Sequence, residues 1–169
     1  MILVVLLKLD FSSQESAYLV ADPITNADIG IQDLSFIQTR SGEIEWEISA
    51  RSAELFESEH RAALENARVV LRTPDGLAVS IEGDRGMINT DNHDFKMEGQ
   101  DNAIRLEITN GYTILTKELE WKDREHLIRS SHPVRILGPW FVIDGVGLII
   151  DTLSQEFKIS EGVHVTFKK

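Results

Sequence analysis

Cysteine is absent from this chain, and its absence removes several classes of function at once. Without thiols the protein forms no disulfide, binds no zinc through thiolates and performs no cysteine chemistry. Catalytic signatures are missing too, since the sequence contains no GxSxG, no phosphate-binding loop and no GxGxxG. We therefore expect a protein that is not an enzyme and that carries no cofactor.

Positive charge is scarce and scattered. Lys and Arg total 17 against 28 Asp and Glu, which gives a formal net charge of −11. A chain of this kind repels phosphate backbones and anionic bilayer surfaces. Charge therefore argues against nucleic acid as a partner.

Residues suited to metal binding or acid catalysis lack the spacing that such sites need. The five histidines lie far apart in the chain, without the pair that places two ligands on one helix face. The aspartates recur near turns, where turn chemistry explains them more simply than a carboxylate pair for sugar hydrolysis. We expect no metal site, and histidines in turns or at the surface.

A long apolar run is also missing, apart from one short stretch at the start. Residues 1–9 read MILVVLLKL, whereas a membrane-spanning helix needs roughly 20 apolar residues. Two interpretations stay open: part of a membrane anchor, or a buried first strand. Residues 10–28 are poorly patterned and indicate a linker. We expect residues 1–28 to form a lead-in and residues 29–169 a single domain.

What the sequence does contain is alternation with a period of two residues, typical of strands with one buried face. The clearest case is Ile44, Trp46, Ile48 and Ala50, each separated by a polar residue. Further runs centre on residues 67–71, 77–81, 104–108 and 159–167, and turn signals such as Thr73-Pro74-Asp75-Gly76 separate them. Short strands with frequent turns predict an antiparallel sandwich, barrel or roll.

Two segments contradict this pattern, because residues 52–67 and 117–129 favour helix by propensity alone. A repeat outweighs that signal. Four segments share an apolar anchor, a polar turn and a following strand, with the anchors at intervals of 32, 33 and 28 residues: Phe56, Ile88, Trp121 and Ile149. The second copy contains too many turn residues to be a helix, so we predict that all four are hairpins that stack on their neighbours.

The order of several short motifs resembles the LptC family of lipopolysaccharide-export proteins, from about Ile29 to Phe167. The motifs are Gly42-x-x-x-Trp46-x-Ile48-x-Ala50-x-x-Ala53, Asp75-Gly76, Gly86-Met87-Ile88, Phe95-Lys96-Met97-Glu98-Gly99, residues 116–121, Ser131-His132-Pro133-Val134-Arg135-Ile136 and Asp144-Gly145-Val146-Gly147-Leu148. The resemblance implies an all-β fold, a jellyroll of two antiparallel sheets that is open at its edges.

The resemblance also implies partners and a location. LptC-like proteins are periplasmic, are tethered to the inner membrane by an N-terminal helix, and sit on the ABC transporter that extracts lipopolysaccharide. They pass the lipid to a periplasmic bridge protein of similar fold. Residues 1–9 depart from this pattern, because the helix is missing or truncated there. The implied contacts are the transporter at the N-terminal edge, about residues 30–38, and the bridge protein at the C-terminal edge.

Two sets of residues follow for the site. Acyl chains would lie between the sheets against a set of inward-facing side chains. For any single residue of this set, a role in the core alone is the simpler interpretation. The set is Trp46, Ile48, Val69, Val79, Ile81, Ile88, Phe95, Met97, Ile104, Leu106, Ile114, Trp121, Ile136, Ile143 and Phe157. The family resemblance implies a second set of residues that dock partners: Gly42, Gly138, His164, Val165, Thr166 and Phe167. The simpler interpretation of the two glycines is that the backbone needs them in a turn or bend.

A rival function from another class stays open at this stage. A structural or adhesive β-sandwich would have the same strands, a filled core and only protein partners. Space between the sheets distinguishes the two, because a lipid carrier needs an apolar slot open to solvent or to one end. A carbohydrate-active jellyroll enzyme comes third.

Overall fold

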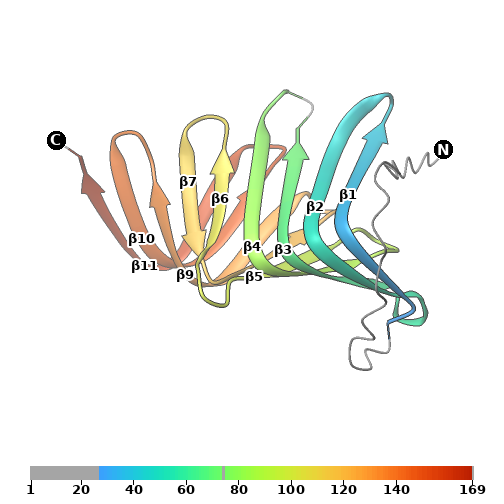
Figure 1. Cartoon of the computed structure of the whole chain (residues 1–169). Coiled ribbons are helices and arrows are strands. Elements are labelled where there is room, and N and C mark those ends of the chain that lie inside the picture. Colours follow the sequence, from blue (N-terminus) through green and yellow to red (C-terminus); the bar gives the residue numbers. More distant parts are fainter. Residues whose placement is uncertain (1–26, 74, 169) are drawn as a thin grey trace.

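The computed structural model describes residues 27–73 and 75–168, and nearly all of them lie in antiparallel strands joined by tight turns (Figure 1). The expected lead-in, residues 1–28, falls almost wholly outside this range. One 3-10 turn, Glu57–Glu59, accompanies the strands. The strands are β1 (Ile29–Arg40), β2 (Glu43–Phe56), β3 (Arg61–Arg72), β4 (Ala78–Asn89), β5 (Phe95–Glu98), β6 (Ile104–Ile108), β7 (Tyr112–Thr116), β8 (Glu118–Lys122), β9 (Leu127–Leu137), β10 (Phe141–Asp151) and β11 (Glu156–Phe167).

The long strands bend in the middle, so that one hydrogen-bonded sheet folds over into two layers (Figure 1). In β4 the first half, residues 79–82, pairs with β6, and the second half, residues 85–88, pairs with β5. Strand β9 divides in the same way between β8 and β7. The predicted all-β jellyroll is confirmed, and its two sheets are continuous through the bends.

We call the two layers layer A and layer B. Layer A contains β6, β7 and the strand halves that pair with them or extend from them: residues 34–40, 43–50, 67–72, 78–83, 134–137, 141–145 and 164–167. Layer B contains β5, β8 and the other halves: residues 29–32, 52–56, 61–65, 85–89, 127–130, 148–151 and 156–159.

A row of polar residues marks the bend across β1 to β4. Pairing passes from Glu65–Arg85 to Ala67–Gly83, so Asn66 and Asp84 lie between the paired stretches. Asn66 has φ 48°, a left-handed conformation that Asn adopts more readily than most residues. The Asp84 carboxylate accepts backbone N–H bonds from residues 100, 101 and 102, at 2.7, 3.1 and 3.3 Å. That carboxylate therefore fixes the link that carries the chain from layer B back to layer A.

The four predicted hairpins are confirmed, and all of them belong to layer B. They are β2–β3, β4–β5, β8–β9 and β10–β11, so residues 52–67 and 117–129 form strands joined by tight turns despite their helix propensity. Each turn holds one residue with positive φ, which makes the repeat visible in the backbone. These residues are His60, His93, His126 and Gln155, with φ between 50° and 61°. Three histidines therefore lie in turns, as predicted.

The hydrophobic core lies between the two layers and receives side chains from both. Its members alternate along the strands with exposed residues, as the period of two requires. The fully buried members with the largest side chains are Ile81, Met97, Ile104, Leu106, Leu119, Ile128, Ile136 and Val69. Hairpins that could not bury an apolar face alone are thus stacked around a shared interior.

Candidate functional site

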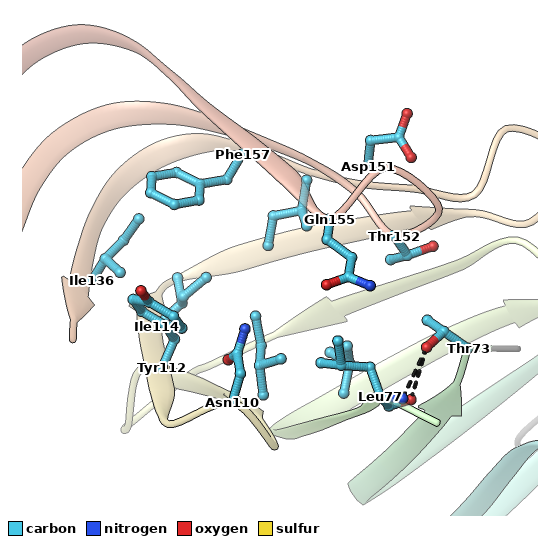
Figure 2. A pocket seen from close by; sticks show the side chains of 13 residues that line it. Thr73, Leu77, Asn110, Tyr112, Ile114, Ile136, Asp151, Thr152, Gln155 and Phe157 are labelled. Carbon is cyan, nitrogen blue, oxygen red and sulfur yellow. Dashed lines mark hydrogen bonds between the residues drawn. The ribbon is translucent and has the colours of Figure 1, made fainter. Parts of the chain in front are cut away.

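A cavity of about 230 Å³ lies between the layers, toward the C-terminal half of the molecule (Figure 2). Val79, Ile114 and Ile136 line it from layer A, while Ile150 and Phe157 line it from layer B. Its rim is polar, because turn residues of both layers meet there: Thr73, Asn110, Asp151, Thr152 and Gln155. The cavity is thus an apolar space with an uncharged or acidic mouth.

Gln155 reaches across that mouth from the β10–β11 turn (Figure 2). Its Nε2 donates a hydrogen bond to Asp75 in the β3–β4 turn, although the two residues are 80 positions apart. Asp75 also accepts a hydrogen bond from the Thr73 hydroxyl. Because β3–β4 belongs to layer A and β10–β11 to layer B, this contact connects the rims of the two layers directly.

Aromatic rings pack together between the layers in the N-terminal half of the interior. Phe95 stacks between the two tryptophans, with ring centroids 6.5 Å from Trp46 and 6.4 Å from Trp121. His93 meets Trp46 edge-on at 5.7 Å, and His126 meets Trp121 at 6.0 Å. Such pairs add about 0.5–1.5 kcal/mol each beyond area burial. This half of the molecule therefore has the packed interior that a structural domain needs.

A second cavity, of about 350 Å³, lies beside the aromatic stack. Trp46 and Leu71 line it from layer A, and Trp121, His126 and Leu153 line it from layer B. Thr73 and Thr152 line both cavities, so the two spaces adjoin along the same mouth. Leu153 is 60% exposed there, which leaves an apolar side chain at the entrance.

The predicted interior residues lie between the layers, with two qualifications. Ile143 is only partly buried at the margin of the core. Phe157 is 45% exposed, because β11 is the last strand and has no neighbour beyond it among the described strands, but its ring still lines the first cavity. The rest are buried core members: Trp46, Ile48, Val69, Val79, Ile81, Ile88, Phe95, Met97, Ile104, Leu106, Ile114, Trp121 and Ile136.

Some lining residues escaped the sequence interpretation. Ile150 follows the alternation of β10, and Leu77, which lies just before β4, continues the alternation of Val79 and Ile81, so both could have been found from it. Thr73, Thr152 and Gln155 lie in turns, where no periodic signal indicates direction. Only the folding of layer A over layer B brings these turns to one mouth.

The two predicted docking glycines lie in turns of layer A. Gly42 has φ +85°, with open space where a side chain would be, so its turn requires glycine for backbone reasons. Gly138 donates its N–H to the carbonyl of Phe141 at 2.9 Å. A Cβ there would lie 3.0 Å from the Phe141 ring and 3.2 Å from Tyr112. Both positions therefore have a structural reason to be glycine.

Strand β11 forms the C-terminal edge of both layers and pairs only with β10 among the described strands. His164, Val165, Thr166 and Phe167 all lie on its layer A half, and Phe167 is 75% exposed. Val165 pairs with Ile143, and Phe157 pairs with Ile150. Strand β11 therefore extends the inward-facing apolar surface of the sheet, and its own apolar side chains there are exposed. The edge thus presents both unpaired backbone groups and an apolar face.

The rim of the first cavity carries one carboxylate, that of Asp151, which points away from the cavity (Figure 2). The pKa of Asp151 is lowered, chiefly because its carboxylate accepts the backbone N–H of Ser154, and also by the N–H of Leu153. Asp151 therefore keeps its charge at neutral pH. The residues that line the first cavity include no Lys or Arg in the part of the chain described. A phosphate group would find no cation there.

Other classes of site have no support in the described residues. No group of three or more His, Asp or Glu side chains in residues 27–73 and 75–168 is arranged to hold a metal ion. Within the same range, no helix is long and apolar enough to cross a membrane.

Comparison with known proteins connects this geometry to a family. A family model described as "Lipopolysaccharide-assembly, LptC-related" matches residues 1–168. The chain belongs to the LptC-related family. The resemblance found in the sequence is thereby confirmed, and lipopolysaccharide transport is the function that this family supports. No curated protein matches the chain.

Among solved structures, the chain is similar to LptH of Pseudomonas aeruginosa, described as the LptA-homologous periplasmic component of the conserved lipopolysaccharide transport device. The identity is 11%, the TM-score is 0.61, and the match covers 73% of this chain and 95% of that one. At this level of identity the likeness shows the fold alone.

Proposed function

We propose that this protein carries lipopolysaccharide by accommodating its acyl chains between layer A and layer B. The observation that supports the proposal most directly is the apolar cavity of about 230 Å³ at the C-terminal half of the interior. Burial of hydrocarbon contributes about 0.8 kcal/mol per CH₂ group. No catalytic group is needed, because transfer from one apolar slot to another of similar depth costs little.

The lack of Lys and Arg in the described lining of the first cavity argues for a division of the cargo. Asp151 stays charged at the rim, and the described lining of the cavity holds no cation. Phosphate groups that entered this space would lose their hydration without an opposite charge, which is costly. We infer that the acyl chains enter while the phosphorylated head group remains in solvent.

The two edges of the sheet suit the two ends of a relay. At the β11 edge, the uncovered apolar face of Val165 and Phe167 fits a strand from a partner whose own interior continues the slot. We propose the periplasmic bridge protein as that partner. We propose the inner-membrane ABC transporter as the partner at β1, with the protein in the periplasm and a membrane tether on the N-terminal side of β1.

The rival, a structural or adhesive sandwich, is favoured by one observation. The stack of Trp46, Phe95 and Trp121 packs rings from both layers together on the β1 side of the interior, as the core of a domain with only protein partners would. Such a domain has no use for the cavity that follows the stack or for an exposed apolar edge. We therefore place the carrier first.

Binding to intact and deacylated lipopolysaccharide separates these two functions. The purified chain is mixed with each form and passed over a size-exclusion column, and the lipid in the protein fractions is quantified. The carrier predicts that intact lipopolysaccharide co-elutes with the protein and that the deacylated saccharide does not. If neither form co-elutes, the carrier is wrong; if both co-elute equally, recognition is through the saccharide and the slot plays no part.

A further inference from the structure

The two tryptophans of the aromatic stack differ in one respect that their packing does not explain. Trp121 donates its indole N–H to the Asp123 carboxylate at 3.3 Å. Trp46 is 2% exposed, and its Nε1 is buried without a hydrogen-bond partner among the described residues. A buried donor that lacks an acceptor costs about 1–3 kcal/mol, so such groups are rare in folded proteins.

A second unpaired group lies on the neighbouring strand. Gln38 is the cross-strand partner of Trp46 in the β1–β2 ladder, and the two residues share one face of layer A. The Nε2 of Gln38 donates to Glu45 at 3.2 Å, but its Oε1 is buried and lacks a partner in the part of the chain described. One unpaired donor and one unpaired acceptor therefore lie on adjacent strands.

The cavity of about 350 Å³ that Trp46 lines adjoins the proposed acyl slot, which gives a ligand a route to this side chain. The indole nitrogen is inaccessible to water in the structure. An occupant that widens the space between the layers next to Trp46 would bring an acceptor to it. Such an occupant is already required by the proposed function.

We propose that Trp46 and Gln38 form a polar subsite for the amide that joins an acyl chain to its sugar, an inference that rests on the proposed function. A secondary amide both accepts and donates, so its carbonyl oxygen takes the Trp46 N–H and its N–H bonds to Gln38 Oε1. Two unpaired buried groups are satisfied by one linkage, and the hydrocarbon beyond it continues into the apolar slot.

Charge around this cavity favours a neutral linkage over a phosphate. Its lining contains the carboxylates of Glu43, Glu45 and Asp123. The guanidinium of Arg72 also lies there, but it pairs with Glu47 at 3.0 Å. An anionic group would meet net negative charge, whereas an amide carries none.

The indole N–H signals of the three tryptophans provide the test. In a ¹⁵N-labelled sample of the full chain, saturation with lipopolysaccharide is expected to move the Trp46 signal downfield, because its proton gains an acceptor. The Trp140 signal is expected to stay in place, since that side chain is 76% exposed and lines neither cavity. The Trp46→Phe variant assigns the signal.

Affinity gives the second readout. Trp46→Phe and Gln38→Met each remove one half of the subsite, and each is expected to weaken lipopolysaccharide binding by about fivefold, the worth of one hydrogen bond. Trp140→Phe is the matched control, because Trp140 is 76% exposed and lines neither cavity, and binding is expected to change less than twofold.

The outcomes separate the inference from the proposed function. If lipopolysaccharide binds but the Trp46 signal does not move, or Trp46→Phe binds as tightly as Trp140→Phe, the subsite is wrong and the carrier function stands. If the unsubstituted chain does not bind lipopolysaccharide, the proposed function fails and the subsite with it.

Discussion

The two halves of the interior are built differently, although the same kind of hairpin forms both. Toward β1, Phe95 and the two tryptophans that flank it form an aromatic stack, and the cavity of about 350 Å³ lies beside that stack. Toward β11, mainly aliphatic side chains surround the cavity of about 230 Å³, and Phe157 at its end is 45% exposed. Both halves therefore leave room between the layers, but the aromatic stack adds stability on the β1 side, while the β11 side ends in an exposed edge.

Phe95→Ala is expected to have the largest effect, because Phe95 is the centre of the aromatic stack. Loss of a buried phenyl ring of this kind costs about 3–5 kcal/mol. Urea unfolding followed by circular dichroism measures the change. A loss of less than about 1 kcal/mol would mean that the stack is loosely packed and that the two halves do not differ as described.

Joining the rims of the layers is expected to stop cargo entry while it stabilises the fold. The variant Asp75→Cys/Gln155→Cys replaces a side-chain contact across the mouth, and the chain offers no other thiol. A short bifunctional thiol reagent closes a long loop, which contributes about 2–4 kcal/mol to stability. Lipopolysaccharide uptake should be abolished.

The single variants Asp75→Cys and Gln155→Cys, treated with the same reagent, serve as controls and should retain uptake. If the cross-linked double variant takes up lipopolysaccharide as fast as these controls, the lipid does not enter through the mouth between β3–β4 and β10–β11.

Phe157→Ala is the counterpart of the Phe95 substitution on the β11 side. Because the ring is nearly half exposed, its loss is expected to cost at most about 1 kcal/mol of stability. The first cavity loses one of its apolar walls, so lipopolysaccharide affinity should fall while the urea midpoint barely moves. A variant that loses stability but keeps full affinity would assign Phe157 to the structure and not to the cargo.

The bend carries a smaller, pH-dependent effect. Backbone N–H bonds from Gln100, then Asn102 and Asp101, hold the pKa of Asp84 below its usual value. A carboxyl whose pKa is lower in the folded state adds stability above its unfolded pKa, about 3.9, and that contribution is lost as pH falls through the folded pKa. Asp84→Asn should therefore lower the melting temperature at pH 7 and leave it nearly unchanged at pH 2.

The outer face provides a matched control for this effect. Glu107 is exposed and pairs with Arg105, but among the described residues its carboxylate accepts no backbone N–H bond of the kind that holds the β5–β6 link. Glu107→Gln is expected to change the melting temperature little at either pH, because exposed ion pairs contribute about 0–1 kcal/mol. Equal effects of the two substitutions would remove the special role of Asp84.

Alternation predicted strands at residues 44–50, 67–71, 77–81, 104–108 and 159–167, and the repeat added the four hairpins, but no alternating run indicated β1 or β7. The segment from residue 52 to 67 shows why the repeat mattered. It favours helix by propensity, but in the hairpin Ala53 of β2 pairs with Leu64 of β3, and both side chains are buried in the core. Local preference is worth a few tenths of a kcal/mol per residue, and tertiary burial exceeds it.

The sequence was silent on how the layers meet. The bend at Asn66 and Asp84, the contact between Asp75 and Gln155, and the unpaired indole of Trp46 all arise when distant strands come together. No periodic pattern encodes them, because each depends on residues that are far apart in the chain. Phe157 illustrates the same limit: its inward direction follows from alternation, but its exposure follows from the position of β11 at the edge.

Photocrosslinking to lipopolysaccharide tests most directly whether the cargo lies between the layers. A photoreactive residue is introduced at Phe157 or Trp121, which face the interior, or at Arg68, which is exposed on layer A. The account predicts lipid adducts from the two interior positions and none above background from Arg68. Adducts from Arg68 alone would place the lipid on the outer surface and contradict the account.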